Sequence, residues 1–389
     1  MKRTIVIAMM SVAPLILVLS QQHSASIRVR NPLRVDRPDE IVSVEWKTIR
    51  KILPDLSAER VRITADGMSD PLVSQVIDLD QDGTPDEAVF QYSFGPRETK
   101  SFVLTSGEPV ASQSLTDARF VLPREDLAWE NDRIAFRMYG PAMAKDVNNG
   151  IDVWTKRVRY LIVEKWYKAS EGSAPGRDSY HEDHGEGADF FSVGRTLGCG
   201  SSALRKNDSL YQPGVFASHK ILATGPLRAI FELSYNTVSY DGVSTTEVKR
   251  ISLDAGSNLN RIEMTFTGPK MGSSVEIAAG LVKRKGTESF VDSKAGWISL
   301  WGMTTEKDVD EFLGLGVIVP RKTVSAVKED KTHLLIIGET KIGTLFTYYS
   351  GAGWTRSGDY DRVSDWNAYL ARFVDRINHP LIIEVRKEK

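Results

Sequence analysis

Hydrophobic and polar residues alternate with a period of two along much of the chain. Residues 27–30, 61–64 and 134–139 show this pattern, which is typical of strands with one buried face. Residues 227–240 are rich in β-branched and aromatic side chains and end at Asp241-Gly242, a pair that favours a two-residue hairpin turn. The pattern predicts a mainly β fold of large antiparallel sheets packed face to face. Further strands are expected at residues 247–253, 259–266, 275–282, 334–337 and 343–349.

Helical patterns are few. Residues 363–377 place four apolar side chains on one stripe, and Ser364 can cap the start of this helix. Residues 151–167 suit either a helix or a strand, because apolar spacing and β-branched content point in different directions. Two polar, glycine-bearing segments, residues 168–187 and 194–208, are expected to be loops. The apolar stripe consists of Trp366, Leu370, Phe373 and Ile377.

The N-terminus has the features of a secretory signal peptide. Lys2 and Arg3 precede an apolar run over residues 5–19, and small residues before position 27 provide a cleavage site. Residues 1–26 are therefore expected to be removed, which makes the protein periplasmic or secreted. An uncleaved N-terminal anchor is the alternative, although the run is short for a span of about 20 residues. No second apolar run of that length follows, so the mature chain is expected to have no membrane span.

The composition limits how the protein can be stabilised and what it can bind. The one cysteine, Cys199, excludes a disulfide within the chain and is expected to be a buried filler rather than a nucleophile. Residues 27–389 are expected to form a single large β-sandwich domain, with a weak boundary near residues 106–115. Without Lys2 and Arg3, 48 basic residues face 51 acidic ones, so the formal net charge changes from −1 to −3. This balance argues against nucleic-acid binding.

The densest group of reactive side chains lies in residues 180–189, which contain two of the six histidines and four carboxylates. Glycines at 185 and 187 indicate a loop in which side chains can converge. Histidine and tyrosine suit proton transfer, and the same residues suit a divalent metal such as zinc. An acidic, solvated loop is the alternative. We expect Tyr180, His181 and His184 to act in catalysis, and Glu182 and Asp183 to bind substrate.

Two further segments, residues 134–139 and 194–200, each contain a candidate arginine. Arg137 and Tyr139 share one face of the strand expected at residues 134–139, where they offer a bidentate fork for a carboxylate and a phenolic proton. A solvent-exposed face that only aids solubility is the alternative. The glycine-rich residues 194–200 carry Arg195 but lack the lysine of a phosphate-binding loop. Their glycines are expected to let the backbone approach a ligand.

An aspartate-rich segment has the alternating spacing of a calcium loop. Hard oxygen ligands at this spacing suit calcium, but Val89 stands where a calcium loop needs a bidentate glutamate. An aspartate-rich turn between strands is the alternative. The candidate ligands of this structural calcium are Asp78, Asp80, Asp82 and Asp86.

Aromatic residues provide candidate sugar-binding surfaces. Trp354 stands among glycines and small polar residues, which favours an exposed ring that stacks on a sugar. Trp154 is a second candidate. Most of the eight tryptophans are expected to be buried.

Several of these motifs occur in one order that resembles a bacterial family named domain of unknown function 4861. The motifs are Phe136-Arg137-Met138-Tyr139-Gly140-Pro141, Gly150-Ile151-Asp152-Val153-Trp154-Thr155-Lys156, Trp166-Tyr167, the 180–187 and 194–200 segments, and Gly351-Ala352-Gly353-Trp354. The resemblance implies a galactose-mutarotase-like β-supersandwich and a role in polysaccharide utilisation. It also implies an oligosaccharide dehydratase, a carbon–oxygen lyase that removes water from a terminal uronic acid of ulvan-type oligosaccharides.

This elimination needs a cation at the uronate carboxylate, a base for the C5 proton and an acid for the C4 hydroxyl. Arg137 or Arg195 would neutralise the carboxylate. His181 would be the base, with Tyr139 or Tyr180 as the acid or with these roles exchanged. His184 or His219 would be a second acid–base group or a metal ligand. The expected substrate-binding residues are Arg195, Asp183, Glu182, Trp354, Trp154 and His219.

Three other functions use the same residues. A mutarotase-like sugar epimerase would use the acid–base pair without eliminating water. A non-catalytic secreted glycan-binding protein would bind the oligosaccharide through aromatic and arginine side chains alone. A metal hydrolase would be built on residues 181–189.

Overall fold

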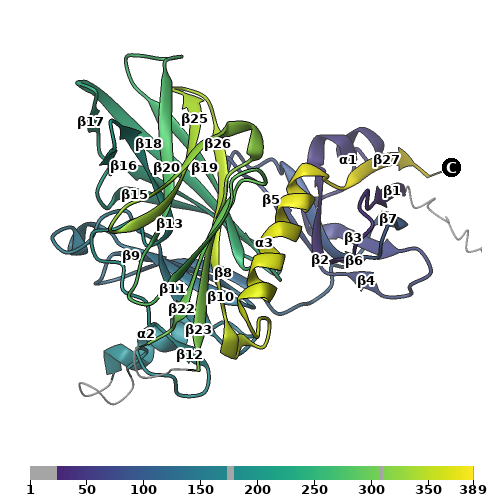
Figure 1. Ribbon diagram of the computed structural model, residues 1–389. Helices are drawn as coiled ribbons and strands as arrows, with labels where there is room; N and C mark the ends of the chain where they lie inside the picture. The colour runs from purple at the N-terminus through teal and green to yellow at the C-terminus, as the bar shows by residue number, and fades with distance from the viewer. Residues whose placement is uncertain (1–23, 173–178, 306–309, 389) are drawn as a thin grey trace, which may run out of the picture.

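The computed structural model describes residues 24–172, 179–305 and 310–388, which form two β-rich lobes (Figure 1). Strands dominate both lobes, and the strand pairs formed within the described ranges are antiparallel. The expected mainly β fold of large antiparallel sheets with few helices is confirmed. Across the residues described, no helix combines the length and the apolar character that spanning a bilayer requires.

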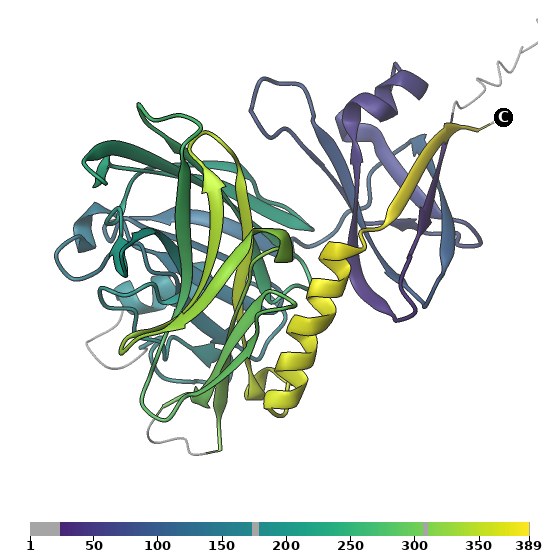
Figure 2. The ribbon, with the colours of Figure 1, turned by 45° about the horizontal axis from the view of Figure 1, so that its top comes forward.

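The smaller lobe packs a five-stranded sheet, β27-β1-β7-β3-β4, against a three-stranded sheet, β2-β6-β5. Ile27, Phe90 and Phe102 are fully buried between them. The beginning and the end of the described chain meet here, because β27 pairs with β1 (Figure 2). The elements are β1 (Ala25–Arg30), β2 (Arg37–Glu45), α1 (Trp46–Ile52), η1 (Ala58–Arg60), β3 (Val61–Ala65), β4 (Pro71–Leu72), β5 (Ser74–Ile77), β6 (Glu87–Phe94), β7 (Thr99–Ser106) and β27 (Ile382–Lys387).

Strand β1 overlaps the end of the expected signal peptide. Residues 1–23 lie outside the described residues, but Ala25 is already buried and paired with Leu104 and Lys387. Cleavage after Ser26 would therefore remove the first two residues of a strand, whereas cleavage before Ala25 would leave the strand whole.

The larger lobe consists of three sheets whose facing side chains form one large hydrophobic core. A nine-stranded sheet has the order β15-β16-β18-β19-β26-β23-β22-β21, with β17 paired to β18. The other two are five-stranded, β14-β13-β20-β25-β24 and β12-β11-β10-β9-β8, and the latter is called the β8–β12 sheet below.

The strands of the larger lobe are β8 (Thr116–Val121), β9 (Asp126–Asn131), β10 (Ile134–Met138), β11 (Asp152–Lys156), β12 (Gly187–Ala188), β13 (Cys199–Lys206), β14 (Ser209–Tyr211), β15 (Phe216–Ala223), β16 (Arg228–Tyr235), β17 (Val238–Tyr240), β18 (Val243–Asp254), β19 (Leu259–Thr267), β20 (Ser274–Val282), β21 (Glu288–Asp292), β22 (Trp297–Met303), β23 (Phe312–Ile318), β24 (Val324–Glu329), β25 (His333–Lys341) and β26 (Phe346–Trp354). Its helices are α2 (Val163–Gly172) and α3 (Val363–Asn378), with short 3₁₀ turns η2 (Pro141–Met143), η3 (Arg321–Thr323) and η4 (Thr355–Ser357).

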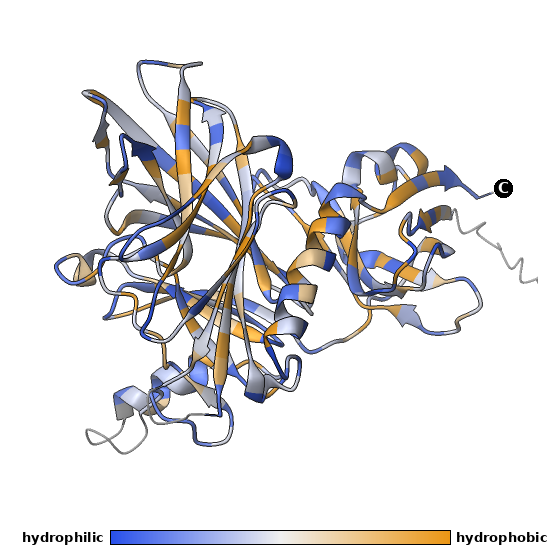
Figure 3. Ribbon diagram, viewed as in Figure 1, coloured by the Kyte–Doolittle hydropathy of each residue, from blue (hydrophilic) through white to orange (hydrophobic). Residues whose placement is uncertain are grey.

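The period-two alternation of the sequence matches the burial of the strands. Along β18, buried residues alternate with more exposed ones, and Figure 3 shows the corresponding alternation of hydrophobic and hydrophilic segments. The predicted hairpin at Asp241-Gly242 is also confirmed. Both residues have positive φ, 53° and 72°, and Tyr240 pairs with Val243 across the turn. This is the geometry that two-residue hairpins of the primed type require.

Residues 151–167, which suited either a strand or a helix, contain one of each. β11 ends at Lys156, and α2 begins at Val163. The carboxylate of Glu130, on β9, accepts hydrogen bonds from the N–H groups of Ile162 (2.8 Å) and Val163 (2.7 Å), and pairs with Lys156 Nζ at 2.7 Å. One buried acid therefore anchors the start of the helix and neutralises a buried cation of the strand.

The prediction of a loop over residues 194–208 is wrong for the part that begins at Cys199 and ends at Lys206. β13 occupies Cys199–Lys206 and pairs with β20 inside a sheet. Its small residues are Cys199, Gly200, Ser201, Ser202 and Ala203, and all are buried. Small polar residues, which are typical of loops, serve here to let two layers approach closely: a Cβ on Gly200 would lie 2.4 Å from Ser350. The loop expected at residues 168–187 is interrupted too, since α2 continues to Gly172.

The predicted C-terminal helix is confirmed as α3, which runs along the larger lobe toward the smaller one (Figure 2). Trp366 and Leu370 are fully buried against β23. Gly314 and Gly316 make this approach possible, because a Cβ on either would lie 2.7 Å from the Trp366 or Leu370 side chain. The expected cap by Ser364 is wrong, since no side-chain hydrogen bond from it reaches the helix start.

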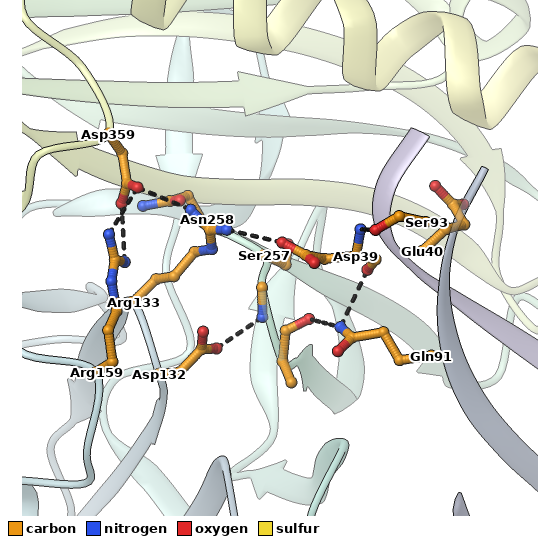
Figure 4. A network of polar contacts seen from close by, with 12 residues as sticks. Asp39, Glu40, Gln91, Ser93, Asp132, Arg133, Arg159, Ser257, Asn258 and Asp359 are labelled. Atoms are coloured by element: carbon orange, nitrogen blue, oxygen red, sulfur yellow. Dashed lines mark hydrogen bonds and ion pairs between the residues drawn. The ribbon is translucent and has the colours of Figure 1, made fainter. Parts of the chain in front are cut away.

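A polar network joins the two lobes beside α3 (Figure 4). Arg133 of the larger lobe lies 2.9 Å from both Asp39 of the smaller lobe and Asp359, and Arg159 also binds Asp359 at 2.8 Å. Residues 107–115 connect β7 to β8 and so lead from one lobe to the other, at the position of the expected weak boundary. Whether the lobes fold as a single domain stays a prediction.

Replacing Glu130 by glutamine should destabilise the protein by about 3–5 kcal/mol, because Lys156 would keep a buried charge without a carboxylate. Urea unfolding followed by circular dichroism measures the change. Glu164→Gln is the matched control, since Glu164 lies on α2 in an exposed pair with Lys168 and should change stability far less. Equal stability of the Glu130→Gln variant and the wild type would contradict the role assigned to this carboxylate.

Candidate functional site

Arg137 is the centre of a buried polar cluster on the outer face of the β8–β12 sheet. Its side chain is 4% exposed and lies on β10 opposite Asp152 of β11. Its Nε lies 2.9 Å from Asp152 Oδ2, and its Nη2 lies 2.9 Å from Asp189 Oδ2. Because a buried guanidinium needs compensating charge, these carboxylates hold the 179–189 segment against the sheet.

Two tyrosines complete the cluster. Tyr139 donates a hydrogen bond to Asp152 Oδ2 (2.9 Å) and accepts one from Arg137 Nη2 (2.8 Å). Tyr180 accepts a hydrogen bond from Arg137 Nη1 (3.4 Å), and its ring stacks on Trp154 with centroids 4.9 Å apart. Residues predicted from two separate motifs are thus brought together by strand pairing and by one loop.

His181 forms the exposed edge of the cluster. Its side chain is 59% exposed, and its Nδ1 lies 3.0 Å from the carbonyl oxygen of Asp189 and 3.5 Å from the Asp189 carboxylate. A carbonyl oxygen only accepts hydrogen bonds, so this contact places the proton of a neutral ring on Nδ1. Nε2 then carries the lone pair and is free to act as a base.

The surrounding charges keep the phenol of Tyr139 protonated. Burial, together with the Asp152 carboxylate, raises the pKa of Tyr139 far above its usual range. Burial and the same carboxylate raise the pKa of Asp189 well above its ordinary value. The cluster therefore combines a phenol that stays protonated with an imidazole whose Nε2 carries a lone pair.

Arg124 is an exposed cation at the edge of this cluster, and the sequence analysis did not identify it. Its guanidinium donates to the Tyr180 hydroxyl and lies 5.6 Å from the centre of that ring. Among the described residues it forms no ion pair with a carboxylate. Unlike Arg137, it is therefore available to an anionic ligand.

A cavity of about 290 Å³ lies beside Tyr180. Glu182 and His184, both exposed, line it together with Lys165 and Trp166. These two predicted site residues thus lie near the cluster and border a cavity, although no contact joins them to Arg137 in the part of the chain described.

Asp183 shapes the loop rather than facing a ligand. Its Oδ1 accepts hydrogen bonds from the N–H groups of Gly185 (2.8 Å) and Gly187 (2.9 Å). Its Oδ2 lies 3.2 Å from Arg157 and 3.3 Å from Arg356. The expectation that Asp183 binds substrate is therefore replaced by a structural role.

The two tryptophans expected to stack on a sugar are buried. Trp354 is 2% exposed and Trp154 is fully buried, so neither ring presents a face to solvent. Trp354 ends β26, which lies between β19 and β23 inside the nine-stranded sheet. The glycines around it allow close packing between layers and do not expose the ring.

Two other predicted residues lie elsewhere on the surface. Arg195 is exposed and donates to the carbonyl oxygen of Lys145 at 3.0 Å. His219 is exposed on β15 and stacks on Phe120 with centroids 4.1 Å apart. Within the described residues, neither contacts the Arg137 cluster.

The aspartate-rich segment connects β5 and β6 in the smaller lobe. Three carboxylate oxygens lie within 4.8 Å of one another, one from each of Asp78, Asp80 and Asp86. Asp82 is outside this group and accepts a hydrogen bond from the N–H of Thr84 (2.7 Å). Backbone hydrogen bonds to Asp78 and Asp80 also fit the alternative of an aspartate-rich turn, so calcium binding stays a prediction.

A cleft of about 550 Å³ lies between the lobes and contains none of the residues predicted for catalysis. Arginines and carboxylates line it in pairs, such as Arg37 with Glu40 (2.6 Å) and Arg228 with Glu87 (3.0 Å). The Arg137 cluster is the better candidate for the active site, because it has an exposed imidazole and an exposed arginine, Arg124, without a carboxylate partner among the described residues.

The sequence analysis missed the acids that organise the cluster. Asp152 stands between buried apolar residues in β11, and an acid at the centre of an apolar strand is a signal that could have identified it. Asp126 lies 3.8 Å from Arg137 Nη1 and accepts a hydrogen bond from Tyr167 (3.0 Å). Its sequence surroundings carry no such signal.

Comparison with known proteins identifies relatives over the whole chain. The family model described as "Domain of unknown function (DUF4861)" matches residues 29–383. A protein of Formosa agariphila named "Uncharacterized protein P7" is 32% identical over 415 residues, which cover 99% of this chain and 100% of that protein.

Solved structures show a much more distant likeness. An alpha-mannosidase from Enterococcus faecalis is 8% identical with a TM-score of 0.49, and a glycosyl hydrolase family 38 protein from the same organism is 9% identical with a TM-score of 0.48. The matches cover 94% and 95% of this chain but only 46% and 48% of those proteins, so the chain spans about half their length.

The pH dependence of stability should report on Asp126. Burial raises its pKa to about 6, partly offset by Arg137, so the folded state binds this proton more tightly than the unfolded state. The stabilisation is complete below the unfolded pKa of about 3.9 and is lost as the pH rises through 6. The free energy of unfolding of the wild type minus that of Asp126→Asn should therefore fall by about 2 kcal/mol between pH 4 and pH 7. A difference that does not vary with pH, measured by urea unfolding, would contradict this.

Proposed function

The chain belongs to the DUF4861 family, and we propose that it is a carbohydrate-active lyase that removes water from a terminal uronate of an oligosaccharide. One observation carries the proposal: Tyr139, Arg137, Tyr180 and His181 belong to one contact network, in which Arg137 and Asp189 link a protonated phenol to an exposed imidazole. An acid and a base held in one network are what the elimination requires.

The reaction moves two protons in opposite directions. His181 Nε2 takes the proton from C5 of the uronate, and the electron pair of that C–H bond forms the C4–C5 double bond. The C4–O bond breaks, and the Tyr139 hydroxyl donates the proton that releases the hydroxyl as water. The products are water and a 4,5-unsaturated sugar, and no oxidant is consumed.

The geometry supports Arg124 as the group that binds the uronate carboxylate. Arg137 is already bound to Asp152 and Asp189, so a substrate carboxylate would have to displace one of them. Arg124 is exposed at the same edge and has no carboxylate partner among the described residues. Arg137 then acts as a positioning residue, which holds Tyr139 and the 179–189 segment in place.

The epimerase alternative uses the same acid and base, and only the product separates it from elimination. A glycan-binding protein would need none of the proton chemistry. For a metal hydrolase, the described residues do not gather three ligand side chains at the 179–189 segment.

Changing His181 to alanine should lower turnover by about 10²- to 10⁴-fold, because the base is lost. Tyr139→Phe should have a similar effect through loss of the acid. The assay is the ultraviolet absorbance of the unsaturated uronate after mixing the protein with uronate-capped oligosaccharides. His379→Ala is the matched control, since His379 is also exposed with Nδ1 near a backbone carbonyl oxygen (3.1 Å), but at the end of α3.

An unchanged rate in His181→Ala would remove this residue from the mechanism. Absence of any absorbance change with the wild type, combined with a shifted anomer or epimer ratio in nuclear magnetic resonance spectra, would favour the epimerase instead.

Replacing Arg124 by glutamine should reduce kcat/KM by roughly 10²-fold, since a bound carboxylate loses a charge-assisted hydrogen bond. Arg124→Lys should recover part of the loss. Arg195→Gln tests the other candidate, and a large loss there with full activity in Arg124→Gln would place the substrate carboxylate at the 194–200 segment.

A further inference from the structure

Arg284 is a partly buried cation, and it has no carboxylate partner in the described part of the chain. It follows β20, and its Nη1 donates to the carbonyl oxygen of Thr304 (3.2 Å). Its Nε and Nη2 are inaccessible to solvent and have no hydrogen-bond partner. The ring of Phe191 lies 5.6 Å from the guanidinium carbon and covers one side of the group.

The buried cations among the described residues are compensated by carboxylates. Lys156 pairs with Glu130 (2.7 Å), and Lys249 pairs with Glu247 (3.0 Å). Arg137 binds two carboxylates, as described above. Arg284 departs from this pattern, and leaving a buried charge unpaired is costly for a folded protein.

The free atoms of Arg284 have a specific geometry. Nε–H and Nη2–H lie side by side on one edge of the planar guanidinium, and this edge binds two oxygens of one acid group. A buried water molecule would satisfy one N–H group but would leave the charge uncompensated. Burial lowers the pKa of Arg284 to about 10, so the group still carries its charge at neutral pH.

We infer that Arg284 is a binding group for an oxyanion, the carboxylate or sulfate ester of an acidic sugar. The unpaired Nε–Nη2 edge receives two oxygens, and the aromatic ring of Phe191 flanks the guanidinium. Phe191 follows Asp189 by two residues, so the segment that carries the cluster at Arg137 also reaches Arg284. The anion site itself does not depend on the proposed elimination, whereas the assignment of the anion to a sugar rests on the proposed function.

Isothermal titration calorimetry of the full chain with sodium sulfate and with sodium glucuronate, at constant ionic strength, tests the inference. Saturable binding of at least one salt is expected in the wild type. Binding of sulfate alone identifies a sulfate-ester site, and binding of glucuronate alone identifies a carboxylate site. Absence of binding for both salts overturns the inference.

Variants locate the binding. Arg284→Met should bind the anion at least about 10-fold more weakly than the wild type, because the charge-assisted hydrogen bonds are removed. Lys283→Met is the matched control, since this neighbouring cation already pairs with Glu329 (2.6 Å) and should leave binding unchanged. Arg124→Gln should also retain the Arg284 signal, which separates it from the uronate site proposed above.

Wild-type affinity in Arg284→Met would overturn the inference. If this variant does not fold, Arg284→Lys replaces it, because lysine keeps the charge but lacks the two-pronged edge. The lysine variant is expected to bind at least about 10-fold more weakly, and equal affinity would overturn the assignment.

Discussion

The candidate site depends on the need to compensate the buried charge of Arg137. This guanidinium lies under the 179–189 segment, out of contact with water, so the surrounding structure must provide negative charge. Asp152 comes from the neighbouring strand, and Asp189 comes from the segment itself. By binding both, Arg137 ties the segment to the sheet and fixes His181 at its edge.

The same principle extends across the outer face of the β8–β12 sheet. Glu130 and Lys156 form a second buried ion pair there, and Glu130 also accepts the first N–H groups of α2. Charged side chains on this face thus act as structural supports for the helix and the loop that cover it. At the edge of the cluster lie the groups that could bind a ligand or exchange a proton with it: His181, Tyr139 and Arg124.

At Arg284, the described residues do not meet the need to compensate a buried charge. Among the described residues, buried cations such as Lys156 and Lys249 are compensated by carboxylates of the chain, so a guanidinium with an unpaired edge is a position where an external anion would complete the structure. Arg124 at the cluster edge and Arg284 are thus two separate arginines of the larger lobe that have no carboxylate partner among the described residues. Two such groups suit a ligand that carries more than one acidic substituent.

The sequence alone determined the features that depend on local periodicity. Strand alternation, the Asp241-Gly242 hairpin and the apolar stripe of α3 are properties of short segments, and the structure contains all of them. It also indicated Arg137, Tyr139, Tyr180 and His181 as candidate site residues, because their types and loop or strand positions suggest such a role, and the structure places these four in one contact network. Tertiary structure decided which partners they have.

Pairing of β10 with β11 sets Asp152 opposite Arg137, and a period-two pattern specifies the face of a residue but not the strand beside it. For the same reason, the sequence did not reveal that Trp354 is buried or that residues 199–206 form a strand. Glycines and small residues are equally compatible with an exposed loop and with two closely packed layers, and only the packing of the sheets distinguishes them.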